Sequence, residues 1–553
     1  MMKNKILIIV FFWSVILFCA NLRIHYADDI KIAIFWVTMA LMIGVMLYQI
    51  FYIKKNQYVL AEIILFFFLL HLVYQANFFG LAESDSYKDY DLVKTIINNK
   101  YIIIDPINSI VSGWPLIHLF TSFVSLINKI DPLMVAKILP SFIESIIAIS
   151  IYLFVHTVYK NEKAALLSCL IVGTIPKFVS FESFFVRESF ALYFFIFFFY
   201  LLYAAKQNDD HRLLALSITL IPVIVLSHHF TSFMLIILLF IFIVASKIIP
   251  FLYRKKPNIE FKKIHIFTFF VILVLALLFY WCYFTPDVIT NFFQVYFEAT
   301  GVKEFTSYGQ RIGITQTIAT LRGNILFYGF FFFHGILSVI LLIELLKKKQ
   351  KHIIENATFT AFLFFCLFLG SLSLFILGSI IYPDRFLPFG WLLGAIPLSY
   401  LLFNLKSIKL KRIVFVIVIS FLIFNIYNIE PSYYTGKNPV DGRASEKEYS
   451  IATTMNIKKP YYGYIGVADT IYDIQRVDFM NGGMKNPIAA DDFFKDSHLA
   501  IIYQDLYVHF LETEKIKSMQ SYQRIVTVLS YEDFKDINKI CDIGDVFILT
   551  WKK

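Results

Sequence analysis

Hydrophobic segments recur along the 553-residue chain, and short polar connections separate them. A helix needs roughly 20 apolar residues to cross the hydrocarbon core of a bilayer, and about thirteen segments approach or reach that length. The pattern therefore predicts a mainly α, polytopic helical membrane protein. The expected spans lie at residues 5–21, 31–53, 58–80, 132–158, 164–180, 187–205, 213–228, 231–248, 264–284, 324–345, 357–381, 387–404 and 413–429.

Basic residues gather in every second connection. The connections at 54–55, 160–163, 206–212, 247–263, 347–351 and 406–412 are all basic. Because Lys and Arg concentrate in cytoplasmic loops, this pattern predicts a multi-pass protein of the plasma membrane with a cytoplasmic N-terminus. It also accounts for much of the net charge of +10, so we expect no nucleic acid partner. A hydrophobic content of 58% excludes an ordinary soluble protein.

Two parts of the chain do not fit the pattern of spans. Residues 106–130 are apolar at helical spacing but carry Gly113 and Pro115, and a span there would invert the basic loops that follow. We therefore expect an amphipathic helix along the outer interface, with Trp114 as an anchor at headgroup level. Residues 431–553 contain turn clusters and short β-rich runs, which predict a small extracytoplasmic α/β domain. The runs are 461–467, 499–503, 525–529 and 546–549.

These features divide the chain into three parts. Residues 1–57 form two N-terminal spans, and 58–430 form a transmembrane module with an acidic outer loop at 81–131. The C-terminal domain follows. On this topology, many of the remaining ionisable residues lie at the outer mouths of helices, which suggests a polar cavity open to the outer face.

The acidic outer loop carries the first candidate site. Glu83 and Asp85 lie just beyond an apolar span. Two carboxylates in a partly desolvated mouth can take different protonation states, or can bind a divalent cation through their oxygens. The alternative is a solvated loop of mixed charge, because Lys88, Lys94 and Lys100 follow closely.

Two further motifs belong to the outer face. The sequence Trp114-Pro115-Leu116-Ile117-His118 places an imidazole on the interfacial helix, and a lone His is also a common packing residue. Arg187 and Glu188 open a later span. Arg187 could face a phosphate and Glu188 could orient a cation or a sugar. Alternatively, the two charges neutralise each other on entering the membrane.

The last candidates lie in short turns between spans. His228 and His229 are adjacent, so at most one of them can point into a site from a regular helix. A structural turn is the alternative. Arg385 lies in a short outer turn, where its guanidinium suits phosphate recognition or extends to the interface as an ordinary snorkelling residue.

With these residues in place, the chain resembles the GT-C superfamily of integral-membrane glycosyltransferases, and more narrowly prokaryotic relatives of the dolichyl-phosphate-mannose protein mannosyltransferases. The run Glu83-Ser84-Asp85-Ser86-Tyr87 resembles the acidic motif that this family carries in an outer loop. Residues 114–118 are similar to its Pro-centred motif ending in His, and Arg187-Glu188 to its Arg-Glu pair. The likeness in layout covers most of residues 58–430.

The resemblance implies an enzyme that moves a sugar from a polyprenyl-phosphate-linked donor to a protein, lipid or glycan acceptor at the outer membrane face. It implies Asp85 as the base and Glu83 as support or metal ligand. Arg385 and Arg187 are then candidates for the phosphate, and Glu188, His118 and Trp114 for the remaining substrate contacts. His228 and Asp85 are candidate ligands if a divalent metal takes part; no other cofactor is expected.

Three alternatives remain open from the sequence. A polysaccharide polymerase or ligase also combines many spans with a large outer loop and arginines, which residues 311–323 would supply. A lipid-linked-glycan transporter would show internal repeats or several charges at mid-span, whereas no repeat is evident and only His71 and Glu144 lie well inside spans. A non-catalytic envelope protein is the third.

Overall fold

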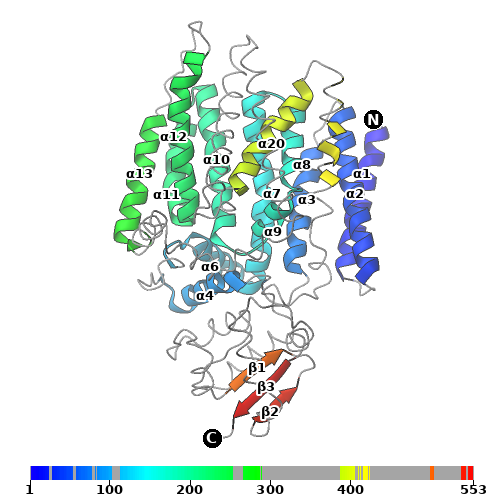
Figure 1. Cartoon of the computed structure of the whole chain (residues 1–553), viewed down its shortest axis with the longest axis vertical. Coiled ribbons are helices and arrows are strands. Elements are labelled where there is room, and N and C mark those ends of the chain that lie inside the picture. The colour runs from blue at the N-terminus through cyan, green and yellow to red at the C-terminus, as the bar shows by residue number, and fades with distance from the viewer. Residues whose placement is uncertain are drawn as a thin grey trace, which may run out of the picture.

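The computed structural model is a bundle of long helices with a small sheet beyond one end (Figure 1). It describes residues 2–23, 28–53, 58–76, 81, 84–102, 112–252, 266–286, 288, 387–404, scattered positions from 409 to 423, 499–503, 537–542 and 546–551. The helices are α1 (Met2–Arg23), α2 (Asp28–Tyr52), α3 (Val59–Ala76), α4 (Ser84–Asn99), α6 (Leu116–Asn128), α7 (Pro132–Tyr159), α8 (Glu162–Val172), α9 (Pro176–Glu182), α10 (Arg187–Asn208), α11 (His211–Ser227), α12 (His229–Leu252), α13 (Ile266–Tyr283) and α20 (Leu387–Asn404).

The helical membrane fold is confirmed. In the described part of the chain, six helices are long and apolar enough to cross a bilayer. They fall within α1, α2, α7, α10, α12 and α13, each of which matches a predicted span. The expected spans at 324–345 and 357–381 lie outside the described residues.

One predicted span is broken in two. The segment 164–180 forms α8 and α9 rather than one continuous helix. The backbone N–H of Gly173 bonds to the Cys169 carbonyl at 2.9 Å, and α9 then starts at Pro176. A proline ring has no N–H to donate and clashes with the preceding turn, so the first turn of a helix is where it fits best.

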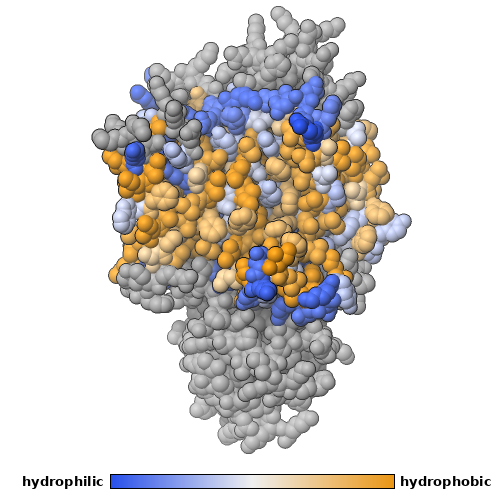
Figure 2. Space-filling view, turned by 180° about the vertical axis from the view of Figure 1, so that it is seen from behind, coloured by the Kyte–Doolittle hydropathy of each residue, from blue (hydrophilic) through white to orange (hydrophobic). Residues whose placement is uncertain are grey.

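Helix α7 lies at the centre of the bundle and packs against α3, α8 and α10. Side chains on the outside of the bundle are also apolar. Trp13, Val37 and Phe279 each expose more than half of their surface. Figure 2 shows the resulting apolar belt on one face, with hydrophilic side chains gathered above and below it. Such a belt is the surface that a bilayer covers.

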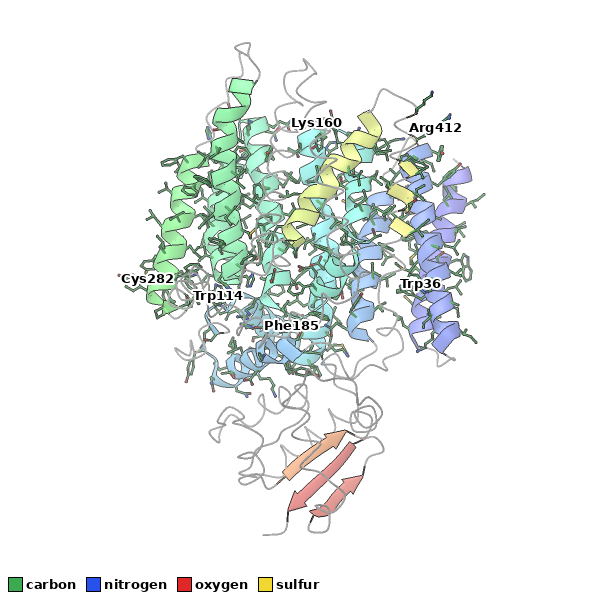
Figure 3. All side chains as sticks on the ribbon, viewed as in Figure 1. Trp36, Trp114, Lys160, Phe185, Cys282 and Arg412 are labelled. Atoms are coloured by element: carbon green, nitrogen blue, oxygen red, sulfur yellow. The ribbon has the colours of Figure 1, made fainter. Side chains whose placement is uncertain are left out.

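The two ends of the bundle differ as the charge pattern predicts. Lys160 and Arg412, from basic connections, lie at one end, whereas Trp114 and Phe185 lie toward the other (Figure 3). Helices α4 and α6 also lie at this second end (Figure 1). The separation of basic connections from the candidate motifs is thus present in the fold.

Helix α6 is amphipathic in the sense expected for a lipid interface. Its buried face is largely polar and includes His118, Thr121 and Ser122, while Phe123 and Ile127 leave about 60% of their surface exposed. An interfacial helix buries its apolar face in lipid and turns its polar face toward the protein or water. The prediction of Trp114 as a headgroup anchor is wrong, because its side chain is fully buried.

The C-terminal part contains a three-stranded antiparallel sheet in the order β1-β3-β2. The strands are β1 (Leu499–Tyr503), β2 (Ile537–Asp542) and β3 (Val546–Trp551). Two of the predicted β-runs, 499–503 and 546–549, are therefore strands, and β2 was not predicted. The runs at 461–467 and 525–529 lie outside the described residues.

The close approach of α8 to α3 can be tested at Gly173. A Cβ atom on Gly173 would lie 2.0 Å from Cε2 of the buried Phe67 ring. We expect Gly173→Ala to lower stability by about 1–3 kcal/mol through overpacking, measured as the unfolding temperature in detergent. Gly44→Ala is the matched control, since nothing lies within 4 Å of a Cβ there. Equal unfolding temperatures for wild type and Gly173→Ala would contradict this packing.

Candidate active site

A buried carboxylate joins three helices at the end of the bundle where α4 and α6 lie. Oδ1 of Asp89, on α4, is 2.9 Å from Nε2 of His118 on α6 and 2.9 Å from Nε of Arg187, the first residue of α10. The side chains of Asp89 and His118 are almost wholly buried, and that of Arg187 is 18% exposed. A charge-assisted cluster of this kind fixes its helices because breaking it leaves a charge buried without compensation.

The hydrogen bond to Asp89 determines which ring nitrogen of His118 carries the proton. A carboxylate only accepts, so Nε2 of His118 carries the proton, and in the neutral ring Nδ1 is then an acceptor. Nδ1 is buried and has no hydrogen-bond partner among the described residues. Burial lowers the pKa of His118, while the hydrogen bond and charge of Asp89 act in the opposite direction and the charge of Arg187 adds to the lowering. A neutral imidazole is therefore favoured in the folded protein.

The predicted base lies one turn from this cluster. Asp85 and Asp89 are four residues apart on α4, and residues at that spacing share a helix face. The side chain of Asp85 and the whole of Glu83 lie outside the described residues. Around them, the Leu81 N–H donates to the Tyr87 hydroxyl at 2.9 Å, which ties the entry of the loop to α4.

The pair Arg187-Glu188 does not simply neutralise itself. Arg187 makes its ion pair with Asp89, on another helix. Glu188 is 3% exposed and interacts electrostatically with Glu182, the last residue of α9. Both predicted residues thus lie near the cluster, and Arg187 is the one that binds it directly.

Trp114 and the two histidines lie together at the junction of α11 and α12. The ring centroids of Trp114 and His229 are 4.6 Å apart, and the Tyr280 hydroxyl donates to the carbonyl of Gly113. Nδ1 of His228 is 3.0 Å from Oγ1 of Thr231. The ring of His229 on α12 thus packs beside the buried Trp114, and Tyr280 on α13 binds the backbone of the residue before it.

A metal centre around His228 does not emerge from the described side chains. Within that part of the chain, no three His, Cys, Asp or Glu residues are grouped so as to hold a metal ion. The side chain of Asp85, the other predicted metal ligand, lies outside the described residues. Arg385, the predicted phosphate ligand, also lies outside them. Both remain predictions.

Asp89 was not among the predicted site residues, although it lies two residues after the acidic motif. Its signal in the sequence is the four-residue spacing from Asp85, which places the two residues on one face because α4 is a helix. What the sequence does not reveal is that Asp89 on α4 meets both His118 on α6 and Arg187 at the start of α10.

No protein-family model and no curated protein matches the chain. Solved structures do match it in fold. The archaeal oligosaccharyltransferase AglB from Archaeoglobus fulgidus, in complex with an inhibitory peptide and a dolichol-phosphate, matches with a TM-score of 0.53 at 12% identity, over 82% of this chain and 70% of that one. The same enzyme's complex with Zn and sulfate has a TM-score of 0.51 at 12% identity, over 80% and 68%.

A second solved protein is similar to this chain over nearly the whole length of both. ArnT from Cupriavidus metallidurans, bound to undecaprenyl phosphate, matches with a TM-score of 0.50 at 10% identity, over 90% of this chain and 98% of that one. The helical membrane fold of this chain is therefore similar to the folds of both proteins. At these identities the likeness shows a shared architecture.

The state of His118 predicts a dependence of stability on pH. Because the pKa of His118 is lower in the folded protein, the unfolded chain takes up the proton first as the pH falls. This contribution is complete above the unfolded histidine value of about 6.5 and is lost as the pH falls below it. We expect the unfolding temperature in detergent to fall between about pH 7 and about pH 5, and to fall less for His118→Gln, whose amide still donates to Asp89. Equal decreases in both proteins would contradict the assignment.

Proposed function

We propose that this chain, which has the fold of the GT-C membrane glycosyltransferases, moves a sugar from a polyprenyl-phosphate-linked donor to an acceptor at the outer membrane face. The observation that carries the proposal is the buried cluster of Asp89, His118 and Arg187. It fixes α4, which bears the acidic motif, at the end of the bundle opposite the basic connections. A lipid-linked donor would reach this end with its chain in the bilayer and its phosphate at the interface.

Asp85 is the proposed base. The acceptor hydroxyl oxygen attacks the anomeric carbon of the sugar while the bond from that carbon to the phosphate oxygen breaks. The hydroxyl proton passes to the Asp85 carboxylate, and the lipid phosphate leaves with the bonding electrons. Asp85 suits this role because Asp89, one turn further along, is already bound to Arg187 and His118. Glu83 would support it from the preceding loop.

Positive charge must stabilise the departing phosphate. Arg187, held at the start of α10 by Asp89, is the described candidate, and Arg385 is the other. Glu188, His118 and Trp114 are buried, so they would lie behind the surface that receives the sugar. Among the described residues no side chains are grouped so as to hold a metal ion, and a divalent cation bound by Asp85 and His228 is a separate proposal.

Localisation follows from the same topology. We place the chain in the plasma membrane with the N-terminus in the cytoplasm and the C-terminal domain outside. That domain would act as a cap or as a docking site for a protein, lipid or glycan acceptor.

The shared fold with an archaeal oligosaccharyltransferase favours a second candidate. In that case an assembled glycan, rather than a single sugar, is the group transferred. Donors that carry one hexose or an oligosaccharide on the same polyprenyl carrier separate the two possibilities.

The role of Asp85 is tested by Asp85→Asn. Using a radiolabelled polyprenyl-phosphate-hexose panel with the full chain in membranes, we expect a loss of transfer of at least about 100-fold, because the amide cannot accept the proton. Asp91→Asn is the matched control on the same helix, since residue 91 lies off the face shared by Asp85 and Asp89. Full transfer by Asp85→Asn would remove this base from the mechanism and leave the class of enzyme standing.

The role of Arg187 is tested by two substitutions. Arg187→Lys keeps the charge but loses the planar fork, so we expect weaker transfer, and Arg187→Gln should be weaker still. Arg212→Gln is the control, because Arg212 is an exposed residue that pairs with Asp210. If both Arg187 variants kept the wild-type KM for the donor, the phosphate contact would have to be assigned elsewhere.

A further inference from the structure

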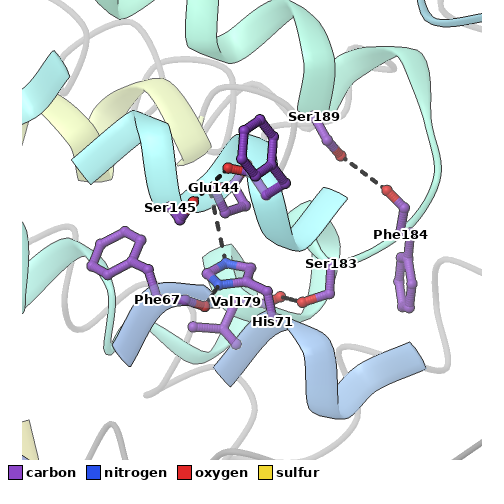
Figure 4. A network of polar contacts seen from close by, with 9 residues as sticks. Phe67, His71, Glu144, Ser145, Val179, Ser183, Phe184 and Ser189 are labelled. Atoms are coloured by element: carbon purple, nitrogen blue, oxygen red, sulfur yellow. Dashed lines mark hydrogen bonds and ion pairs between the residues drawn. The ribbon is translucent and has the colours of Figure 1, made fainter. Parts of the chain in front are cut away.

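A second polar cluster lies inside the bundle, away from the candidate site. Glu144 is twelve residues into α7, about 18 Å from the start of that helix at 1.5 Å per residue. Its side chain is fully buried, and so is that of His71 on α3. Figure 4 shows that the two side chains face each other. Ionisable groups at membrane depth are costly, and they are usually paired or functional. The proposed transfer reaction uses neither of them.

The hydrogen bond made by His71 determines its tautomer. Nδ1 lies 2.8 Å from the carbonyl oxygen of Phe67, and a carbonyl only accepts, so Nδ1 carries a proton. In the neutral ring, Nε2 then presents a lone pair. Nε2 is buried, points toward Glu144, and lacks a hydrogen-bond partner in the described part of the chain.

The contact between His71 and Glu144 is complete only with a proton. Nε2 is 3.8 Å from Oε2 of Glu144, which is too far for a direct hydrogen bond. A lone pair facing an ionised carboxylate would be repulsive, whereas a proton on either group makes the contact attractive. A bridging water suits the separation, since contacts beyond 3.5 Å between polar atoms are often water-mediated. Neither carboxyl oxygen of Glu144 has a hydrogen-bond partner among the described residues.

Two carboxyl groups near Glu144 add negative charge, and a neutral thiol also faces α7. Glu182, at the end of α9, is fully buried and interacts electrostatically with Glu144. Glu188 on α10 interacts in turn with Glu182. From α8, the Cys169 thiol faces α7 and donates to the Ala148 carbonyl. Two neighbouring carboxyl groups in a medium of low dielectric constant cannot both stay ionised without a compensating charge.

We propose that His71, Glu144 and Glu182 form a buried proton-binding site within the helical bundle. The site holds one exchangeable proton, with a water molecule between His71 and Glu144. It is distinct from the cluster around Asp89. Electrostatic neighbours connect the two, because Glu188 interacts with Glu182 and directly follows Arg187. A proton gained or lost in the bundle would therefore change the field at Arg187.

Infrared spectroscopy tests the site without any substrate. The full chain in lipid nanodiscs is titrated from about pH 5 to about pH 9, and the carbonyl band of protonated carboxyl groups is followed. We expect a band that titrates in the wild type and that Glu144→Gln removes or displaces. His71→Asn should shift its titration. Glu62→Gln is the matched control: Glu62 is also buried and lies on α3 with His71, but one of its oxygens accepts from Gln49 at 3.2 Å.

The control should remove only its own contribution and leave the titration of the Glu144 band unchanged. If Glu144→Gln does not fold, Glu182→Gln takes its place and should displace the same titration. A wild-type spectrum with no titrating carboxyl band would overturn the proposal. The proposal would also be overturned if the carboxyl band titrated as in the wild type in Glu144→Gln or, where that variant does not fold, in Glu182→Gln.

A second measurement rests on the proposed function. If protonation of the buried site changes the electric field at Arg187, the KM for a polyprenyl-phosphate donor should depend on pH in the wild type. It should depend on pH less in Glu144→Gln, with kcat little changed. The two proposals fail separately. Absence of transfer would defeat the proposed function and leave the infrared result intact, whereas a pH-independent spectrum would defeat the proton site alone.

Discussion

The double pairing of Asp89 is the interaction on which the arrangement of the candidate site depends. One carboxylate oxygen meets both the imidazole of His118 and the guanidinium of Arg187, and so joins α4, α6 and α10. Removing a charge from water costs several kcal/mol, and removing only one partner leaves that cost uncompensated. Moving any one of the three helices away would therefore break an ion pair or hydrogen bond of Asp89. In this way a loop helix outside the spans acquires a fixed position relative to a spanning helix.

The bilayer sets the second constraint. Lipid-facing positions are apolar, as in the exposed face of α6, so polar side chains are directed into the protein or toward the ends of the bundle. The polar face of α6 meets α4, where Ser122 donates to the carbonyl of Val93 at 3.3 Å. Two polar regions result: one near the end of the bundle around Asp89, and one deeper, around Glu144. The sequence motifs lead to the region around Asp89. The buried polar atoms of His71 and Glu144 that lack hydrogen-bond partners among the described residues lead to the deeper region.

The sequence predicts the spans and the separation of basic connections from acidic motifs, because both follow from local hydrophobicity and charge. It also predicts two of the three strands. It does not predict the break before Pro176, which divides an apolar run, nor the burial of Trp114 against His229, which depends on the packing of α12. The importance of Asp89 was missed for the same reason. Its spacing from Asp85 is visible in the sequence, but its partners come from 29 residues away in one case and from a different spanning helix in the other.

The central claim is that the end of the bundle organised by Asp89 receives a lipid-linked phosphate. Photo-crosslinking of the full chain in membranes, with a polyprenyl phosphate that carries the reactive group next to its phosphate, tests this most directly. The account predicts labelled peptides from α4 and from the start of α10, with less labelling when Arg187 is replaced by Gln. Labelling confined to the opposite end, beside Lys160 and the other basic connections, would contradict it.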